Sequence, residues 1–335
     1  MGALTPSYLP VGAAFLQWAH RAMDVIFHLG AHRTATTSFQ DYMRRHRDTL
    51  AAQGVGFWGP QRTRRGLHAG ILPSANAHHH ELSADCVSRR ITDQLDHAQR
   101  KQLKHLVVSD ENMIGTVRDN IRQGALYPRV ATRLARFAAA YDGRVKTVLF
   151  SPRSLELYWC SALAYGVGRG VSVPDRTALR SIAMARRSWR DVIADIASAV
   201  PDAAVRVLPF ERYAGQPRRV LQDGLGIDAP ADSTRHWLNP APQLPELRRL
   251  MAENGTAAAV LPFGMGRWNP FANDEHAALR ELYSDDMMWL TAGADGLAIL
   301  TEDRHRDEAG STLPPVTHRK GRCDELEERK LARPG

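Results

Sequence analysis

The stretch from Val25 to Gln40 reads VIFHLGAHRTATTSFQ and joins an apolar run to a glycine, an arginine and a group of hydroxyls. A strand, a tight turn and a helix start bring free backbone N–H groups and the positive end of a helix dipole around one anion. Arg33 would add a delocalised positive charge. A helix cap alone would use one hydroxyl, and four are present. We therefore predict an anion-binding loop of Gly30, Ala31, His32, Arg33, Thr34, Ala35, Thr36, Thr37 and Ser38.

This loop departs from the Walker A pattern of triphosphate-binding proteins, G-x-x-x-x-G-K-[ST]. From Gly30 the chain reads G-A-H-R-T-A-T-T, so that Ala35 replaces the second glycine and Thr36 replaces the lysine. That lysine reaches the β- and γ-phosphates, and its absence argues against hydrolysis of ATP or GTP. A P-loop nucleotide or nucleoside kinase is kept as an alternative, which the missing lysine opposes.

Further groups suited to this chemistry follow other expected strands. Arg153 comes after the apolar run 145–150 and could offer a bidentate fork to a phosphate. Ser161 comes eight residues later, about two helical turns further on. An exposed arginine and a serine on a helix face are each common, so this pair carries weight only together with the first loop.

Three side chains are candidates for a general base. Asp110 and Glu111 follow the expected strand 104–109, and a carboxylate there could take a proton from an acceptor or cap the next helix. His32 is a third candidate, because an imidazole titrates near neutral pH. His28, inside the first strand, is expected to pack in the core or to orient the loop.

Strands and helices alternate along the chain. We expect strands at 25–29, 55–58, 104–109, 145–150 and 205–208, and helices at 37–53, 127–141, 155–166 and 187–199. This alternation predicts an α/β fold, a single three-layer domain around a mainly parallel sheet, with ligands beyond the carboxyl ends of the strands. Residues 59–92 are expected to form a loop. Its histidines at 78–80 are expected to be solvated, because consecutive residues do not easily converge on one metal ion.

Composition narrows the class of protein. The 335 residues carry a formal charge of +8, which suits an anionic ligand, but the arginines do not interleave with aromatics as in a nucleic-acid surface. Three scattered cysteines and the lack of an apolar run of ~18 residues predict a cytoplasmic protein without a zinc site. We expect an extension at 1–22, the α/β domain at 23–300 and a disordered charged tail at 301–335.

Together these motifs resemble those of sulfotransferases that use 3′-phosphoadenosine 5′-phosphosulfate (PAPS). Bacterial members often read H-x-G-x-H-K-T-G-T-T, and this chain matches at His28, Gly30, His32, Thr34, Thr36 and Thr37. The resemblance, which runs in order from about residue 23 to 300, implies a 5′-phosphosulfate loop at 30–38 and a 3′-phosphate site at Arg153 and Ser161. It also implies that Arg267, beside Trp268 in the late G-x-W segment, contacts the 3′-phosphate or the adenine.

The resemblance further implies transfer of a sulfuryl group from PAPS, without a metal, to a hydroxyl or amine of a carbohydrate, lipid or small metabolite. Arg33 would stabilise the leaving phosphate, and Glu111 is preferred as base over Asp110 and His32. Arg33 replaces the family's usual lysine and Ala35 replaces a glycine, which restricts φ. A catalytically inactive nucleotide-binding protein of the same fold is therefore a second alternative. The acceptor is expected to lie against 62–68, 112–122 and 168–176.

Overall fold

The computed structural model of the chain describes residues 23–73, 84–232, 237–255, 257 and 260–301. Three predictions lie outside the described residues. They are the extension at 1–22, the solvated histidines at 78–80 and the charged tail from 302 onward.

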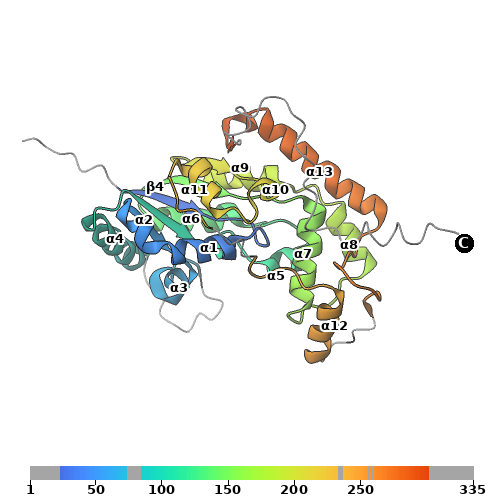
Figure 1. The fold of residues 1–335 in the computed structure, drawn as a ribbon. Coiled ribbons are helices and arrows are strands. Elements are labelled where there is room, and N and C mark those ends of the chain that lie inside the picture. Colours follow the sequence, from blue (N-terminus) through green and yellow to red (C-terminus); the bar gives the residue numbers. More distant parts are fainter. Residues whose placement is uncertain (1–22, 74–83, 233–236, 256, 258–259, 302–335) are drawn as a thin grey trace, which may run out of the picture. The chain divides into compact units, whose positions relative to one another are not determined.

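A six-stranded sheet forms the centre of the fold (Figure 1). Its strands are β1 (Asp24–His28), β2 (Val55–Trp58), β3 (His105–Ser109), β4 (Val145–Phe150), β5 (Ala204–Val207) and β6 (Ile299–Leu300). All neighbours are parallel, and their order is β2-β3-β1-β4-β5-β6. The expected α/β fold with a mainly parallel sheet is confirmed, and β1 lies between β3 and β4.

Helices connect the strands. They are α1 (Thr36–Arg45), α2 (Arg47–Ala52), α3 (Pro60–Arg62), α4 (Ala84–Arg100), α5 (Val117–Gln123), α6 (Val130–Ala140), α7 (Leu155–Val167), α8 (Arg176–Ala183), α9 (Trp189–Ala199), α10 (Phe210–Tyr213), α11 (Pro217–Leu225), α12 (Leu244–Glu253) and α13 (Asn273–Thr291). Shorter helical turns are η1 (Thr63–Leu67), η2 (Glu111–Met113) and η4 (Ala294–Gly296).

Successive residues of the strands pack into two apolar cores, one on each face of the sheet. Ile26 packs in one core with residues of α1, α2 and α11, whereas its neighbour Phe27 packs in the other with residues of α4, α6 and α9. This alternation follows from the pleat of a strand, which points successive side chains to opposite faces. Helices on both faces make the arrangement consistent with a three-layer α/β fold.

The structure corrects two expectations about secondary structure. The stretch 59–92 is not one loop, because α3, η1 and the beginning of α4 lie within it. In α4, Val87, Ile91 and Leu95 are buried at a spacing of four residues, a narrow apolar stripe among charged and polar neighbours. The expected helix 37–53 is interrupted at His46, whose φ of −98° and ψ of 18° separate α1 from α2.

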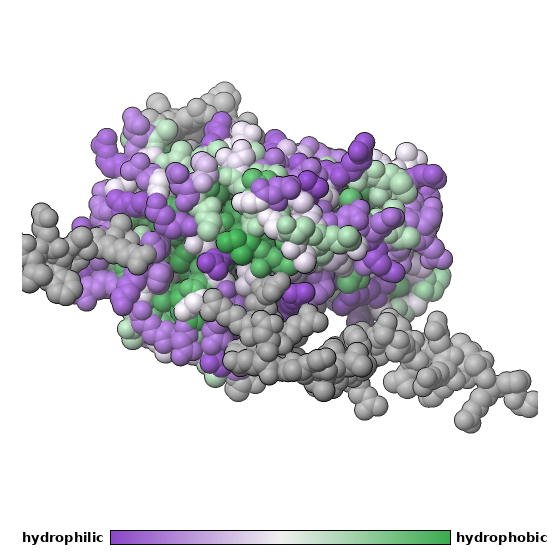
Figure 2. Space-filling model, turned by 90° about the horizontal axis from the view of Figure 1, so that it is seen from above, coloured by the Kyte–Doolittle hydropathy of each residue, from purple (hydrophilic) through white to green (hydrophobic). Residues whose placement is uncertain are grey.

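The surface is mixed in character. On the face drawn in Figure 2, hydrophilic residues cover most of the surface and hydrophobic ones gather toward its middle. Within the described part of the chain, no helix is both long and apolar enough to cross a bilayer.

A buried carboxylate links the last long helix to the region of β4. Asp286 of α13 is 3% exposed and accepts hydrogen bonds from the Ser188 hydroxyl (2.5 Å) and the Trp189 amide (2.9 Å) at the start of α9. The Trp189 indole in turn donates to the carbonyl of Arg153, just beyond β4 (2.7 Å). Asp286 therefore helps to hold the segment that carries Arg153.

We expect Asp286→Ala to lower the free energy of unfolding by roughly 2–3 kcal/mol, because buried donors lose their acceptor. Urea unfolding followed by circular dichroism measures this change. Asp285→Ala is the matched control, since Asp285 is exposed, and we expect it to change stability by less than about 0.5 kcal/mol. Equal unfolding midpoints for the two variants would contradict the role given to Asp286.

Candidate anion-binding site

The loop between β1 and α1 has the backbone of an anion cradle. Gly30, Arg33 and Ala35 all have positive φ, at 46°, 68° and 63°, and such alternation turns successive N–H groups toward one point. A Cβ on Gly30 would lie 2.5 Å from the Thr36 hydroxyl, so glycine is required there. Among the described residues, the amides of Thr34, Ala35 and Thr36 have no backbone acceptor.

The hydroxyls of the loop are not equivalent. Thr34, Thr37 and Ser38 each hydrogen-bond to another group, the last two to the 237–243 segment. The Thr36 hydroxyl is buried and has no partner within the described chain. Because buried polar groups are nearly always satisfied, Thr36 is the hydroxyl best placed to bind a ligand.

A cavity of about 490 Å³ opens over this loop. Arg33, Arg153 and Arg267 line it together with Thr36 and Thr37. Its other walls are formed by His32, Ala35, Gln40, Pro60, Arg64, Glu111, Val117, Leu157, Cys160, Ser161, Ala164, Tyr165, Phe210, Trp268 and the whole 237–243 segment.

The structure brings the two separate arginine motifs into contact. Arg33 donates from Nε to the Ser161 hydroxyl (3.1 Å), and Arg153 donates to the carbonyl of Arg33 (3.0 Å). Ser161 and Arg153 were expected to bind the same ligand as Arg33, and all three line one cavity.

Arg64 is the arginine of the cavity that is paired with carboxylates, whereas the other three carry positive charge without an ion pair in the described part of the chain. Within the described residues, Arg33, Arg153 and Arg267 form no ion pair with a carboxylate. Arg153 is 8% exposed, and its Nε has no partner. Burial, and then the charge of Arg267, lower the pKa of Arg153 to about 10, and burial also lowers the pKa of Arg33. The cavity therefore favours an anion, which would relieve this unpaired charge.

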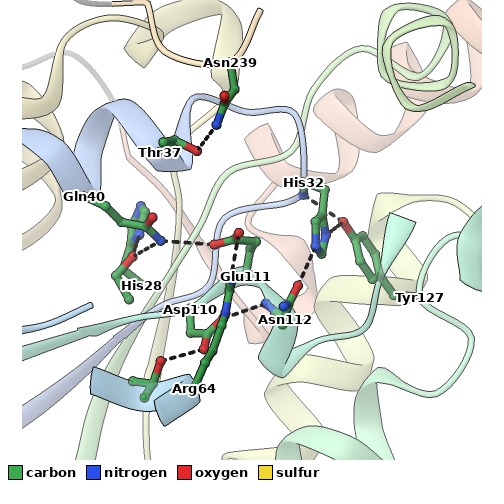
Figure 3. Close-up of polar contacts among 12 residues, drawn as sticks. His28, His32, Thr37, Gln40, Arg64, Asp110, Glu111, Asn112, Tyr127 and Asn239 are labelled. Atoms are coloured by element: carbon green, nitrogen blue, oxygen red, sulfur yellow. Dashed lines mark hydrogen bonds and ion pairs between the residues drawn. The ribbon is translucent and has the colours of Figure 1, made fainter. Parts of the chain in front are cut away.

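Glu111, which follows β3, lies on the wall of the same cavity. Its carboxylate accepts hydrogen bonds from Arg64 (3.0 Å) and from the Gln40 amide (3.0 Å), as Figure 3 shows. Burial raises the pKa of Glu111, but the positive charge of Arg64 lowers it, and the net shift is downward. Glu111 is thus an ionised carboxylate held in a defined orientation at the cavity.

Asp110 has a different environment. It caps η2 by accepting a hydrogen bond from the Asn112 amide (3.0 Å), and it also accepts from Thr63 (2.7 Å) and Arg64 (2.6 Å). It is buried and does not line the cavity. Asp110 therefore has the capping role that was the alternative to its assignment as a base.

Both ring nitrogens of His32 are engaged. Nδ1 lies 2.8 Å from the Tyr127 hydroxyl and Nε2 lies 3.1 Å from Oδ1 of Asn112 (Figure 3). Burial lowers the pKa of His32, which favours the neutral ring. With neither nitrogen free, His32 is less suited than Glu111 to accept a proton from a ligand.

His28 packs in the core, as one of its two expected roles required. Its ring stacks on Phe39 with 4.0 Å between centroids, and Nδ1 lies 2.8 Å from the Ser109 hydroxyl. Burial lowers the pKa of His28 to about 4, so the ring is neutral in the folded protein near pH 7.

Several residues of the cavity escaped the sequence analysis. Gln40 lies one helical turn after Thr36, and that spacing could have placed it on the same helix face. Arg64 was expected only as part of the acceptor wall 62–68, and its ion pairs with Asp110 and Glu111 were missed. The two adjacent acids at 110–111 could have indicated a basic partner. The 237–243 segment carried no recognisable signal. The residues 168–176 were expected to form part of the acceptor wall, but none of them lines the cavity. Residues of α7 line it instead.

Among the described residues, no group of three or more His, Cys, Asp or Glu side chains could hold a metal ion. Comparisons with protein-family models, with curated proteins and with solved structures each found no match. The geometry of the cavity is therefore the basis on which a function is inferred for this chain.

Ala35 holds a left-handed conformation that costs an L-residue roughly 1–2 kcal/mol. We expect Ala35→Gly to raise the free energy of unfolding by about 0.5–1 kcal/mol, since glycine adopts positive φ without a steric cost but has greater freedom when unfolded. In Ala135→Gly, at an exposed site inside α6, the same exchange should instead destabilise the protein by about 1 kcal/mol. Chemical denaturation of both variants tests the opposite signs, and a loss of stability in each would contradict the strain at Ala35.

The depressed pKa of His28 predicts a pH dependence of stability. In the unfolded chain His28 takes up a proton near pH 6.5, whereas in the folded chain it does so near pH 4, so stability falls as the pH decreases between these values. From pH 7 to pH 5 we expect His28 to account for a loss of about 1–2 kcal/mol. In His28→Gln the difference in unfolding free energy between these pH values should shrink accordingly. His97→Gln, at an exposed position, should leave it unchanged.

Proposed function

We propose that the protein is a PAPS-dependent sulfotransferase that transfers a sulfuryl group to a hydroxyl or amine. One observation carries the proposal: Arg33 and Ser161, which lie 128 positions apart in the chain, are hydrogen-bonded to each other. They line a cavity in which Arg33, Arg153 and Arg267 form no ion pair with any described carboxylate. A nucleotide with phosphates at both the 5′ and 3′ positions needs two such basic subsites close together.

In this proposal the loop of residues 30–38 acts as a P-loop-like 5′-phosphosulfate loop. Its free amides, the unpartnered Thr36 hydroxyl and the guanidinium of Arg33 would bind the 5′-phosphate. Arg153 and Ser161 would bind the 3′-phosphate, together with Arg267, which lines the same cavity and whose charge acts on Arg153. The ordered anion-binding groups, in place before the ligand arrives, are the kind of preorganisation that stabilises developing charge.

The reaction would proceed by in-line displacement at sulfur. The acceptor oxygen or nitrogen forms a bond to the sulfur of PAPS, while the bond from sulfur to the 5′-phosphate oxygen breaks. The leaving product is 3′,5′-ADP, whose new phosphate charge Arg33 and the loop amides would stabilise. Glu111 would take the proton of the acceptor, and Arg64 and Gln40 orient its carboxylate.

Two other functions are less well supported. A catalytically inactive nucleotide-binding protein is suggested by Arg33 and Ala35 in place of the family's lysine and glycine. The cavity contains Arg33 as a cation, and Ala35 has the left-handed conformation that a glycine would adopt. The positive charge of the family's lysine and the positive φ of its glycine are therefore both retained. A P-loop kinase lacks support because the triphosphate-binding lysine is absent.

Calorimetric titration with 3′,5′-ADP tests the proposed nucleotide site. We expect 5′-AMP to bind at least tenfold more weakly than 3′,5′-ADP. It lacks the 3′-phosphate and therefore the charge-assisted hydrogen bonds that this group accepts. Arg33→Ala and Arg153→Ala should each weaken the binding of 3′,5′-ADP at least tenfold. Arg136→Ala, on the exposed face of α6, is the matched control and should not change it.

Unchanged affinity in both cavity variants would refute the proposed site, and binding of ATP alone would favour the kinase. Radiolabelled PAPS offered with a panel of hydroxyl- and amine-bearing acceptors then separates the remaining two functions. Transfer of label to any acceptor supports the sulfotransferase, and tight 3′,5′-ADP binding without transfer to any of them supports the inactive protein.

A further inference from the structure

The loop of residues 260–266, which we name the apolar loop, exposes large hydrophobic side chains. Phe263 is 93% exposed and Met265 is 81% exposed, more than any other large hydrophobic residue in the described parts of the chain, and Val260 is 61% exposed. Three such side chains within six residues differ from the isolated exposed residues that most protein surfaces carry.

The apolar loop projects from a fixed base. Leu261 and Trp268, near its two ends, are buried at 3% and 4% exposure. The amide of Leu244 donates to the carbonyl of Gly266 (2.8 Å), and Gln243 forms a β-bridge with Arg267. Between these anchors Gly264 and Gly266 have φ values of 132° and 89°, which allow the chain to turn at the tip. The exposure of Phe263 and Met265 thus belongs to an anchored turn.

Two arginines flank the apolar loop, Arg248 and Arg267. No Asp or Glu occurs between residues 254 and 272. The Arg248 guanidinium lies 4.9 Å from the centre of the Phe263 ring and donates a hydrogen bond to the carbonyl of Pro262. Within the described residues Arg248 has no carboxylate partner, and Arg267 follows the loop directly. The whole chain carries a formal charge of +8.

We propose that the apolar loop docks onto an anionic lipid bilayer. Phe263 and Met265 enter the boundary between headgroups and acyl chains, while Arg248 lies at the level of the lipid phosphates. Apolar side chains at the tip of a segment, with arginine beside them, favour binding to the surface of an anionic membrane. A protein partner fits less well, because a specific interface needs roughly 800 Å² on each side, more than one projecting turn provides.

Docking at this loop would bring the cavity close to the lipid surface. Arg267 and Trp268 follow the apolar loop directly and line the cavity. Gln243, which is bridged to Arg267, lines it as well. The inference itself does not require the proposed sulfotransferase activity, since it depends only on the loop and its charges.

Co-sedimentation with vesicles tests the inference on the full chain. We expect the protein to bind vesicles of phosphatidylcholine containing about 30% phosphatidylserine, at least tenfold more tightly than vesicles of phosphatidylcholine alone. The double variant Phe263→Glu with Met265→Glu should bind the anionic vesicles at least tenfold more weakly. Met288→Glu is the matched control, because Met288 is 68% exposed on α13, and it should bind like the wild type.

Circular dichroism and a thermal melt of each variant show whether it is folded, and exposed positions such as Phe263 should tolerate the change. The inference is overturned if the wild type stays in the supernatant at every lipid concentration, or if the double variant sediments as the wild type does. Equal binding to both vesicle types would also overturn it. Sedimentation velocity supplies a further test, since an oligomer that the double variant abolishes, without vesicle binding, would assign the loop to contact between copies of this chain.

Discussion

β1 is hydrogen-bonded along both edges, to β3 and to β4, and this pairing fixes where the anion-binding loop, Glu111 and Arg153 lie relative to one another. Because the three strands are parallel, their carboxyl ends meet at one edge of the sheet. The anion-binding loop follows β1, Glu111 follows β3 and Arg153 follows β4. Arg33 and Arg153, 120 positions apart in the chain, are thereby brought to one cavity.

Charge is distributed unevenly within this cavity. Arg33, Arg153 and Arg267 have no carboxylate partner among the described residues, whereas Arg64 is shared between Asp110 and Glu111. Buried charge without a partner is costly, and a bound anion would offset that cost. The charge of Arg64 keeps Glu111 ionised, and hydrogen bonds from Arg64 and Gln40 orient its carboxylate. A ligand is thus expected to place its anionic groups on the arginines and a proton-bearing group toward Glu111.

The fold maintains the site through groups that touch no ligand. His28 is neutral because it is buried, and it supports the end of β1 through Ser109 and Phe39. Trp189 holds the Arg153 carbonyl and is itself held by Asp286 of α13. The strain of Ala35 in the left-handed region is tolerated because packed elements precede and follow the loop. The positions of the anion-binding groups are therefore a property of the whole domain.

The sequence by itself determined five of the six strands, the span of α1 and α2, and the helices α6, α7 and α9, because these depend on local periodicity and on residue type. It also determined the two arginine motifs, whereas β6, α5, α8 and α12 were not expected. The beginning of α4 was missed because its buried apolar residues form only a narrow stripe among charged and polar ones. The break at His46 had no local signal. Only the tertiary structure decided that Asp110 caps η2 while Glu111 faces the cavity, since the packing around β3 sets the direction of each side chain. The same holds for the contacts of Arg33 with Ser161 and of the 237–243 segment with the loop. Such contacts join residues far apart in the chain, and they exist only once the parallel sheet has formed.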